Sequence, residues 1–352
     1  MRSIHQLWLS LLLLLSLPLN AETVRVLNWE AYLSENVQKK WEKESSSNLE
    51  VIYFDNDQQR DSILLESKHH NIDIAIVDEV IAERFGKEGR LLKLTEQNVP
   101  NINNNEPFWR ERCSNYAIPY LWGTLGIIYR SDIIKQPPQS WREILEPSDE
   151  LKGHIAMLDD YTDMIAPALF LDGFDLNTEN PSELKQAFNR LKAQTEHVLT
   201  YEYPISFVQT SPKKDDLYMA VAYGGDQFTL NEIVGEEGLW KYAVPKEGTV
   251  LWVDCLAVTS TSTQQEKALE LINYLSTPKV AAQNATDLFY ATPNIPALEE
   301  LNPEFRNNPN VFPEHEILKK SGLYEVLSNS NIKQRIRISS AIINLHESKQ
   351  AR

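Results

Sequence analysis

Residues 24–77 read VRVLNWEAYLSENVQKKWEKESSSNLEVIYFDNDQQRDSILLESKHHNIDIAIV, and this stretch decides the fold. Three runs in it have strand character, VRVLN (24–28), LEVIYF (49–54) and IDIAIV (72–77), and helical segments separate them. Ser34 is a suitable N-cap for the first of these helices, and residues 57–67 form the second. This β-α-β-α-β order predicts a parallel sheet with helices on both faces.

The same alternation continues through the rest of the chain. Further strands are expected at 125–129, 154–158, 198–203, 219–223 and 250–258, and further helices at 79–85, 181–196, 264–276 and 332–350. The central part of the chain therefore forms a second α/β unit. Because ligands of such sheets gather at the carboxyl ends of the strands, candidate site residues are sought there.

The N-terminus predicts export. Arg2 precedes an apolar run from Leu7 to Leu19, and Ala21 offers a small residue for cleavage. This pattern is typical of a secretory signal peptide, whereas a membrane anchor needs about 20 apolar residues. We therefore expect residues 1–21 to be removed near Ala21 and the mature protein to be periplasmic. No cysteine follows the expected cut, so nothing indicates a lipid anchor.

Composition and motifs exclude several classes of function. The formal net charge of −16 repels nucleic acid, so a nucleic-acid partner is not expected. Cys113 and Cys255 either pair in the oxidising compartment or are two buried thiols, and their spacing leaves this open. The chain has no GxSxG, HExxH or GxxxxGK motif, and His69-His70 lacks further spaced ligands. We expect no enzyme activity, no cofactor and no metal site.

Acidic and aromatic residues follow the expected strands. Trp29, Glu30 and Tyr32 come directly after the first strand, although the two rings would equally suit an ordinary core. Asp160 and Asp163 follow the strand at 154–158 and are expected to lie on one face of the first turn of a helix running to about residue 170. The string DDYTD at 159–163 also matches the DDxxD motif of prenyl-diphosphate enzymes, but those carry it in an all-helical fold.

A second group of candidates lies later in the chain. Strand alternation places Trp252 and Asp254 on the same face of an apolar run, where an acid must meet a cation, hydrogen-bond donors or water. Tyr223 and Tyr290 are weaker candidates at other strand exits. Carboxylates pair with ammonium groups, and aromatic faces attract the charge and cover a methylene chain. The mixture therefore predicts a site for an organic cation.

On these residues the chain resembles the bacterial periplasmic polyamine-binding proteins, the spermidine/putrescine receptors of ABC importers. The matching segments are Asn28-Trp29-x-x-Tyr32, Ile118–Thr124 (IPYLWGT), Asp160 with Asp163, Pro245–Gly248 (PKEG) followed by Trp252-x-Asp254, and Tyr290 with Thr292-Pro293-Asn294. The resemblance implies an α/β, type II solute-binding fold with a ligand cleft between two discontinuous lobes that close by hinge motion. It implies that residues 22–128 plus 253–298 form lobe 1 and residues 129–252 plus 299–352 form lobe 2.

The resemblance also implies roles for the matching residues. Asp254 would bind an amine with Trp252 stacked along the chain, and Asp160 and Asp163 would hold another ammonium, while the remaining aromatic residues wall the cleft. Several positions depart from the family pattern: Glu30 for a small hydroxyl residue, Asp78 and Val80 for Ser and Tyr, Tyr223 for Trp, and Tyr324 or Glu325 near a usual Gln. The extra acids Glu30 and Asp78 favour a triamine such as norspermidine or spermidine over putrescine.

Two partners are compatible with this resemblance. The fold includes a norspermidine-sensor branch that reports to an inner-membrane receptor of the GGDEF/EAL type controlling cyclic di-GMP and biofilm formation. Its members and the importer proteins, which deliver ligand to an ABC permease, would differ in the surface shown to the partner. The departures favour the sensor slightly, with polyamine transport as the alternative and a binder of another organic cation, such as a quaternary amine or basic amino acid, as a third. A monomer is expected in each case.

Overall fold

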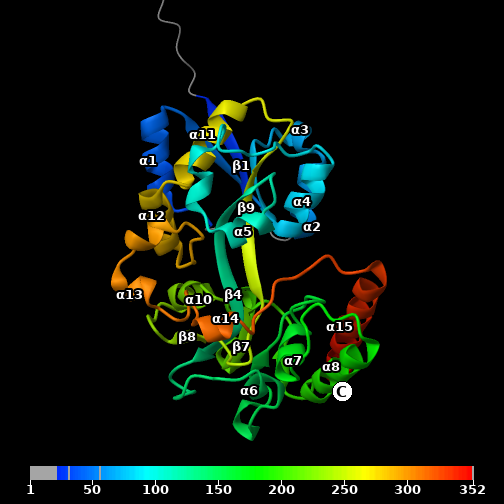
Figure 1. Ribbon diagram of the computed structural model, residues 1–352. Coiled ribbons are helices and arrows are strands. Elements are labelled where there is room, and N and C mark those ends of the chain that lie inside the picture. Colours follow the sequence, from blue (N-terminus) through cyan, green and yellow to red (C-terminus); the bar gives the residue numbers. More distant parts are fainter. Residues whose placement is uncertain (1–21, 31, 55–56, 351–352) are drawn as a thin grey trace, which may run out of the picture.

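The computed structural model describes residues 22–30, 32–54 and 57–350. The signal peptide expected at residues 1–21 lies outside the described residues. Figure 1 shows two lobes, one around β1 and the other around β7, with the long strands β4 and β9 running between them. The two-lobed α/β fold expected from the sequence is confirmed.

The strands follow the sequence prediction closely in position. They are β1 (Thr23–Asn28), β2 (Asn48–Tyr53), β3 (Ile74–Asp78), β4 (Ile118–Arg130), β5 (Ile155–Ala156), β6 (Val198–Thr200), β7 (Met219–Tyr223), β8 (Trp240–Ala243) and β9 (Leu251–Val258). The strand expected at 154–158 shrinks to two residues, and the one expected at 125–129 is the second half of the much longer β4.

Helices cover the strands in both lobes. The α-helices are α1 (Glu35–Ser45), α2 (Asp57–Leu65), α3 (Ser67–His70), α4 (Glu79–Lys87), α5 (Pro107–Arg112), α6 (Arg142–Leu145), α7 (Ala166–Leu171), α8 (Pro181–Gln194), α9 (Pro204–Thr210), α10 (Asp226–Val234), α11 (Gln265–Leu275), α12 (Pro278–Leu288), α13 (Pro303–Arg306), α14 (His315–Leu318) and α15 (Asn329–Gln350). Short 3₁₀ turns lie at Pro100–Asn104, Asp149–Leu151, Lys214–Asp216 and Pro296–Glu299.

Local chemistry explains where two of these helices begin. Ser34 is the N-cap of α1, as predicted, because its Oγ accepts a hydrogen bond from the backbone N–H of Val37 at 3.3 Å. The helix expected to open at Asp160 begins instead at Ala166. Asp160 folds the preceding turn, since its Oδ1 accepts from the backbone N–H groups of Thr162 and Asp163 at 2.7 and 2.8 Å.

The sheet is mixed, which corrects the expectation of a parallel sheet. Strands β2, β1 and β3 are parallel neighbours, but β9 lies antiparallel to both β3 and β4, and β4 lies antiparallel to β7 and β8. The strand order is β2-β1-β3-β9-β4-β7-β5-β6, with β8 paired to β4. The chain enters β9 from the second lobe without a crossover helix, and this return path reverses its direction.

Two lobes meet where three chain segments lie side by side. In β4 the side chains up to Trp122 belong to the core of the first lobe, and those from Leu125 onward belong to the second. The same change of core occurs at the start of β9, because Val250 packs with the core of the second lobe and Leu251 with the core of the first. Gly322 forms the third crossing, because its carbonyl accepts from the N–H of Leu251 at 2.7 Å.

The lobe bounds expected from the sequence remain a prediction. Buried side chains between residues 301 and 323, such as Leu301 and Phe305, pack with the core of the first lobe. Tyr324 packs with the core of the second lobe, and so do Ile338 and Ile342 of α15.

Candidate functional site

Asp254 stands at the junction of three strands. In the register of the sheet it lies opposite Asp78 of β3 on one side and Leu121 of β4 on the other. Trp252 and Asp254 are both partly exposed whereas Leu251 and Val253 are buried, so the two candidates share one face of β9 as predicted. Trp252 lies opposite Gly123, where an added Cβ would come within 2.4 Å of the indole ring.

Tyr32 is held beside Asp254 by buried polar contacts. The hydroxyl of Tyr120 donates to the carbonyl of Tyr32 at 3.0 Å and accepts from the Asn284 amide at 2.8 Å. The carbonyl oxygen of the same amide accepts from the N–H of Ser34 at 3.0 Å. The Tyr32 side chain itself is buried, and its hydroxyl lies close enough to Asp254 to lower the pKa of that carboxyl. Burial raises the pKa of this hydroxyl, and the negative charge of Asp254 raises it further.

Several of the predicted aromatic residues pack against one another in the first lobe. Tyr290 packs edge-on against Tyr32, with ring centroids 5.2 Å apart, and against Trp252 at 5.5 Å. Trp29 packs against Phe54 at 4.2 Å. All of these belong to the first core or its margin. Tyr32, Trp252 and Tyr290 therefore form one aromatic cluster beside Asp254, while Trp29 packs separately on Phe54.

The second lobe contributes a buried carboxylate of its own. Asp163 accepts hydrogen bonds from the hydroxyl of Tyr223 at 2.5 Å and from the hydroxyl of Tyr324 at 2.6 Å. Of the two candidates that the sequence left near the usual Gln, Tyr324 contacts Asp163, while Glu325 is exposed. Asp160 lies next to Asp163 and is partly exposed. This group of side chains comes from the turn before α7, the end of β7 and the third crossing segment.

The two lobes present these groups to one another. Tyr290 of the first lobe packs on Gly225 of the second, where an added Cβ would lie 2.7 Å from the ring. The pKa of the Asp57 carboxyl is raised by loss of solvation and lowered by the charge of Arg60. The charge of Asp160, in the other lobe, is among those that raise it, so these two carboxylates face one another across the lobes. We call the set formed by Trp29, Tyr32, Asp78, Asp160, Asp163, Tyr223, Trp252, Asp254, Tyr290 and Tyr324 the interlobe site.

Two carboxyl groups of the interlobe site, Asp254 and Asp163, have raised pKa values. Burial raises the pKa of Asp254 to about 7, although Tyr32 and Arg60 oppose the shift. Burial also raises the pKa of Asp163 to about 7, and Asp160 adds to it against the hydrogen bonds from the tyrosines. The pKa of the neighbouring Glu79, at the start of α4, is raised to about 8 by burial and by the charges of Asp78 and Asp254.

Two predicted site residues are placed differently from the others. Glu30 is exposed. Asp78 is the N-cap of α4, because its Oδ1 accepts from the N–H of Ile81 at 2.7 Å, and its Oδ2 contacts the Arg60 guanidinium at 2.7 Å. The charge of Asp78 is thus already compensated within the protein, which weakens the argument that it favours a triamine.

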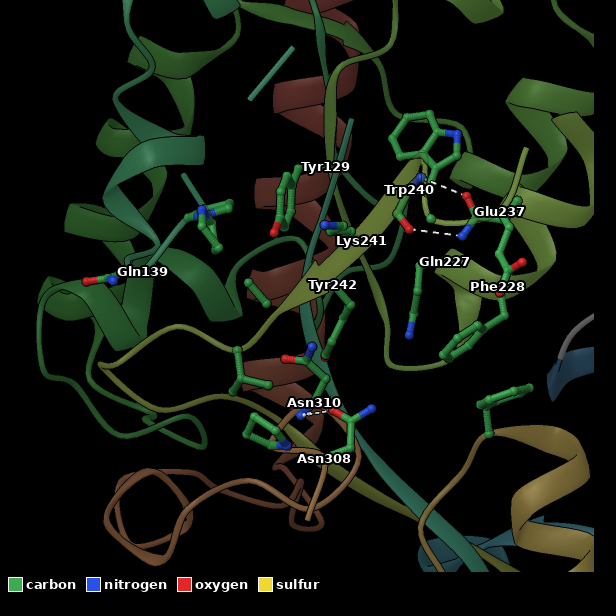
Figure 2. A pocket seen from close by; sticks show the side chains of 18 of the residues that line it. Tyr129, Gln139, Gln227, Phe228, Glu237, Trp240, Lys241, Tyr242, Asn308 and Asn310 are labelled. Carbon is green, nitrogen blue, oxygen red and sulfur yellow. Dashed lines mark hydrogen bonds between the residues drawn. The ribbon is translucent and has the colours of Figure 1, made fainter. Parts of the chain in front are cut away.

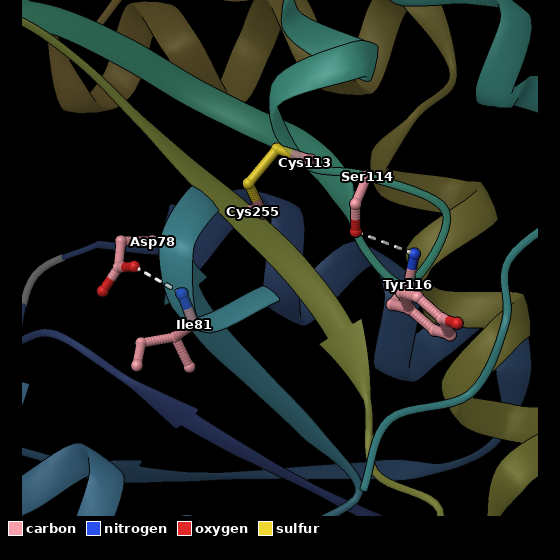
Figure 3. Close-up of a disulfide and its surroundings, with 6 residues drawn as sticks. All are labelled: Asp78, Ile81, Cys113, Ser114, Tyr116 and Cys255. Carbon is pink, nitrogen blue, oxygen red and sulfur yellow. Dashed lines mark hydrogen bonds between the residues drawn. A yellow bond between two sulfur atoms is a disulfide. The ribbon is translucent and has the colours of Figure 1, made fainter. Parts of the chain in front are cut away.

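A disulfide ties the strand of Asp254 to the neighbouring helix. Cys113 at the end of α5 and Cys255 of β9 are paired, with their Cα atoms 5.8 Å apart and both side chains buried. Figure 3 shows this bridge joining Cys113 to Cys255 of β9, with Asp78 capping α4 nearby. The alternative of two free thiols does not apply, since none occurs among the described residues.

A separate cavity of about 1120 Å³ lies along β8 and α10 of the second lobe. Figure 2 shows Tyr129, Trp240 and Tyr242 beside it. None of the interlobe site residues lines this cavity. Its carboxylates, such as Glu236 and Glu237, are exposed, so they lack the desolvation that would make an ion pair strong.

Within residues 22–30, 32–54 and 57–350, no cluster of histidine, cysteine or carboxylate side chains could hold a metal ion. In the same part of the chain, no helix is both long and apolar enough to cross a membrane. The interlobe site combines carboxylates with ring faces. This combination suits a flexible organic cation that carries its charges at several points.

Comparison with known proteins agrees with this chemistry. The family model of bacterial extracellular solute-binding proteins matches residues 16–313. The norspermidine sensor of Vibrio cholerae serotype O1 is 33% identical over 330 residues, which cover 94% of this chain and 91% of the relative. The spermidine/putrescine-binding periplasmic protein of Escherichia coli K12 is 28% identical over 308 residues, covering 84% of this chain and 85% of the relative.

A solved structure has the same fold. It is the substrate-binding protein of a spermidine/putrescine ABC transporter from Streptococcus pneumoniae, with a TM-score of 0.81 and 23% sequence identity over 93% of this chain and 100% of that one. These relatives are binding proteins and a sensor, not enzymes.

Proposed function

Because this chain belongs to the family of bacterial extracellular solute-binding proteins, we propose that it binds a polyamine of the norspermidine and spermidine class between its lobes. One observation carries the proposal: each lobe contributes a desolvated carboxylate, Asp254 in the first and Asp163 in the second, and aromatic rings lie around the first. A diamine or triamine would join the two carboxylates through its ammonium groups and lay its methylene chain on the rings.

Individual roles follow from this arrangement. Asp254 pairs with an amine, and the buried hydroxyl of Tyr32 beside it becomes a hydrogen-bonding group for the ligand. Asp163 and Asp160 hold an ammonium in the second lobe, with the hydroxyls of Tyr223 and Tyr324 orienting the carboxylate. Trp252 and Tyr290 cover the alkyl chain.

Calorimetric titration tests this function. The purified mature protein is titrated with norspermidine, spermidine, putrescine, lysine and choline, alongside Asp254→Ala. Asp132→Ala is the matched control, because Asp132 is a carboxylate of the second lobe paired with Arg130 at 2.7 Å. We expect micromolar or tighter polyamine binding that is lost in Asp254→Ala and kept in the control. Binding of choline or lysine alone would assign the site to another class of cation, and folded protein that binds none of the five would contradict the proposal.

We infer that the protein works in the periplasm and reports to a membrane partner. The apolar segment 7–19 acts as a signal peptide cleaved near Ala21, and the mature chain is a monomer. We favour a receptor of the GGDEF/EAL type over an ABC permease, because the sensor relative has the higher identity and matches more of the chain than the importer relative.

A gene deletion separates the two partners. Polyamine uptake and biofilm formation are measured separately in the deleted strain. Altered biofilm with intact uptake is the result expected of a sensor, whereas lost uptake would assign the chain to an importer.

A further inference from the structure

A buried cation lies at the first-lobe end of the interlobe site. Arg60 of α2 is only 1% exposed, although it belongs to a helix whose neighbouring acids lie nearer the surface. Its guanidinium contacts Asp57 at 2.8 Å, Asp61 at 2.9 Å and Asp78 at 2.7 Å. A single guanidinium thus compensates three carboxylates, helped at Asp61 by the exposed Arg84 at 3.1 Å.

Arg60 lies close enough to the interlobe site to affect its charge. Asp78, which it contacts, stands directly opposite Asp254 in the sheet. Two carboxylates in such a cross-strand pair repel one another unless a cation is present. The guanidinium also lies over the ring of Phe54, 6.0 Å from its centroid, and that ring packs against Trp29.

The acids in the interlobe site and beside it divide into two groups by their partners. Asp57, Asp61 and Asp78 are paired with arginine. Asp254, Asp160 and Asp163 have no ion pair with a basic side chain of the described residues. Only the second group is open to ammonium groups of a ligand, and a ligand charge near the first group meets the positive charge of Arg60.

We propose that Arg60 is a resident counter-cation that limits the number of ammonium groups that the interlobe site accepts. The inference rests on the polyamine-binding function proposed above and concerns selectivity within that class. Removing the guanidinium leaves Asp57 and Asp78 without a cation and Asp61 with Arg84 alone, and this is costly for the less exposed Asp78. A further ammonium of a longer polyamine would then take its place, so the benefit grows with the charge of the ligand.

Titration of a charge series tests this proposal. Wild type and Arg60→Gln are titrated with putrescine, norspermidine and spermine, which carry two, three and four amines. We expect the ratio of the putrescine Kd to the spermine Kd to rise about tenfold in Arg60→Gln, the size of a modest charge-pair coupling. Arg60→Lys keeps the positive charge and should retain the wild-type ratio. Arg130→Gln removes an arginine paired with Asp132 in the other lobe and is the matched control.

A second variant covers the case in which Arg60→Gln does not fold. Asp78→Asn leaves Arg60 with one carboxylate fewer, so the excess positive charge should weaken spermine binding more than putrescine binding. The ratio of the putrescine Kd to the spermine Kd should therefore fall, opposite to the rise expected in Arg60→Gln. Equal changes for all three ligands in both variants would overturn the proposal and leave Arg60 a purely structural residue. Absence of polyamine binding by the folded wild type would instead contradict the proposed function itself, so the two failures are distinguishable.

Discussion

At the scale of single residues, two carboxyl groups of the interlobe site have pKa values raised into the neutral range. Asp254 and Asp163 each have a pKa near 7 because burial disfavours their charged form. A bound ammonium group favours the charged form instead, so binding near neutral pH releases protons. Above pH 7 the carboxylates are already ionised and binding is tight, while below pH 7 the ligand must displace bound protons.

We therefore predict that polyamine affinity falls about ten- to hundredfold between pH 8 and pH 6, as expected for one or two groups titrating near 7. Calorimetry in two buffers with different heats of ionisation would measure the proton release directly. Asp254→Asn removes one of the two groups, so whatever affinity this variant keeps should depend less on pH. A pH-independent affinity in the wild type would contradict the prediction.

The variant Tyr324→Phe tests the hydrogen bonds that hold the Asp163 carboxylate. Its hydroxyl donates to the carboxylate at 2.6 Å and so favours the ionised form. Tyr324→Phe should weaken polyamine binding at pH 7 by about tenfold, the usual size of a hydrogen bond to a charged group. Tyr201→Phe is the matched control, because the Tyr201 hydroxyl is buried without a hydrogen-bond partner among the described residues. Equal affinities of the two variants would mean that Tyr324 does not support the carboxylate.

Sequence reasoning found some of these residues and missed others for a physical reason. Asp254 was predictable because a carboxylate in an apolar strand is costly unless it has a function or a partner. Arg60 was not, since an arginine three residues after Asp57 and next to Asp61 looks like a solvated ion pair on a helix. Its burial depends on Phe54 and on the distant Asp78, which the spacing does not show.

At the scale of secondary-structure elements, the disulfide fixes β9, the strand that carries Asp254, to α5. The bridge closes a loop between residues 142 positions apart. Closing so long a loop restricts the unfolded chain, which stabilises the native state by about 5 kcal/mol in the chain-entropy account. We predict that the double variant Cys113→Ser, Cys255→Ser loses stability of this order in urea unfolding. A reducing agent should lower the stability of the wild type and leave that of the double variant unchanged; equal stability of the two proteins without reductant would contradict this.

Element positions were more predictable than element directions. The apolar runs located β1, β3 and β7 well because each is a buried strand with a clear hydrophobic signal. The antiparallel direction of β9 could not be predicted from its own residues, because it depends on the path by which the chain returns from the second lobe. The helix start at Ala166 was missed because Asp160 caps a turn rather than the helix itself.

At the scale of the whole molecule, the acids on the two lobes oppose closure when no ligand is bound. Asp57 of the first lobe and Asp160 of the second are close enough for one charge to raise the pKa of the other. Three adjacent crossings, in β4, before β9 and at Gly322, connect the lobes and are the hinge candidate. A polyamine between the lobes would cancel the repulsion and draw them together.

Small-angle X-ray scattering measures this closure. We predict that norspermidine lowers the radius of gyration of the wild type, as expected when the lobes close about a hinge. High salt should produce part of the same change without ligand, because it screens the charges that face one another. Asp160→Asn removes the second-lobe charge and should make the empty protein more compact at low salt, while Asp132→Asn, a carboxylate of the second lobe paired with Arg130, should not. A radius that responds to neither ligand nor salt would mean that charge does not control the relative position of the lobes.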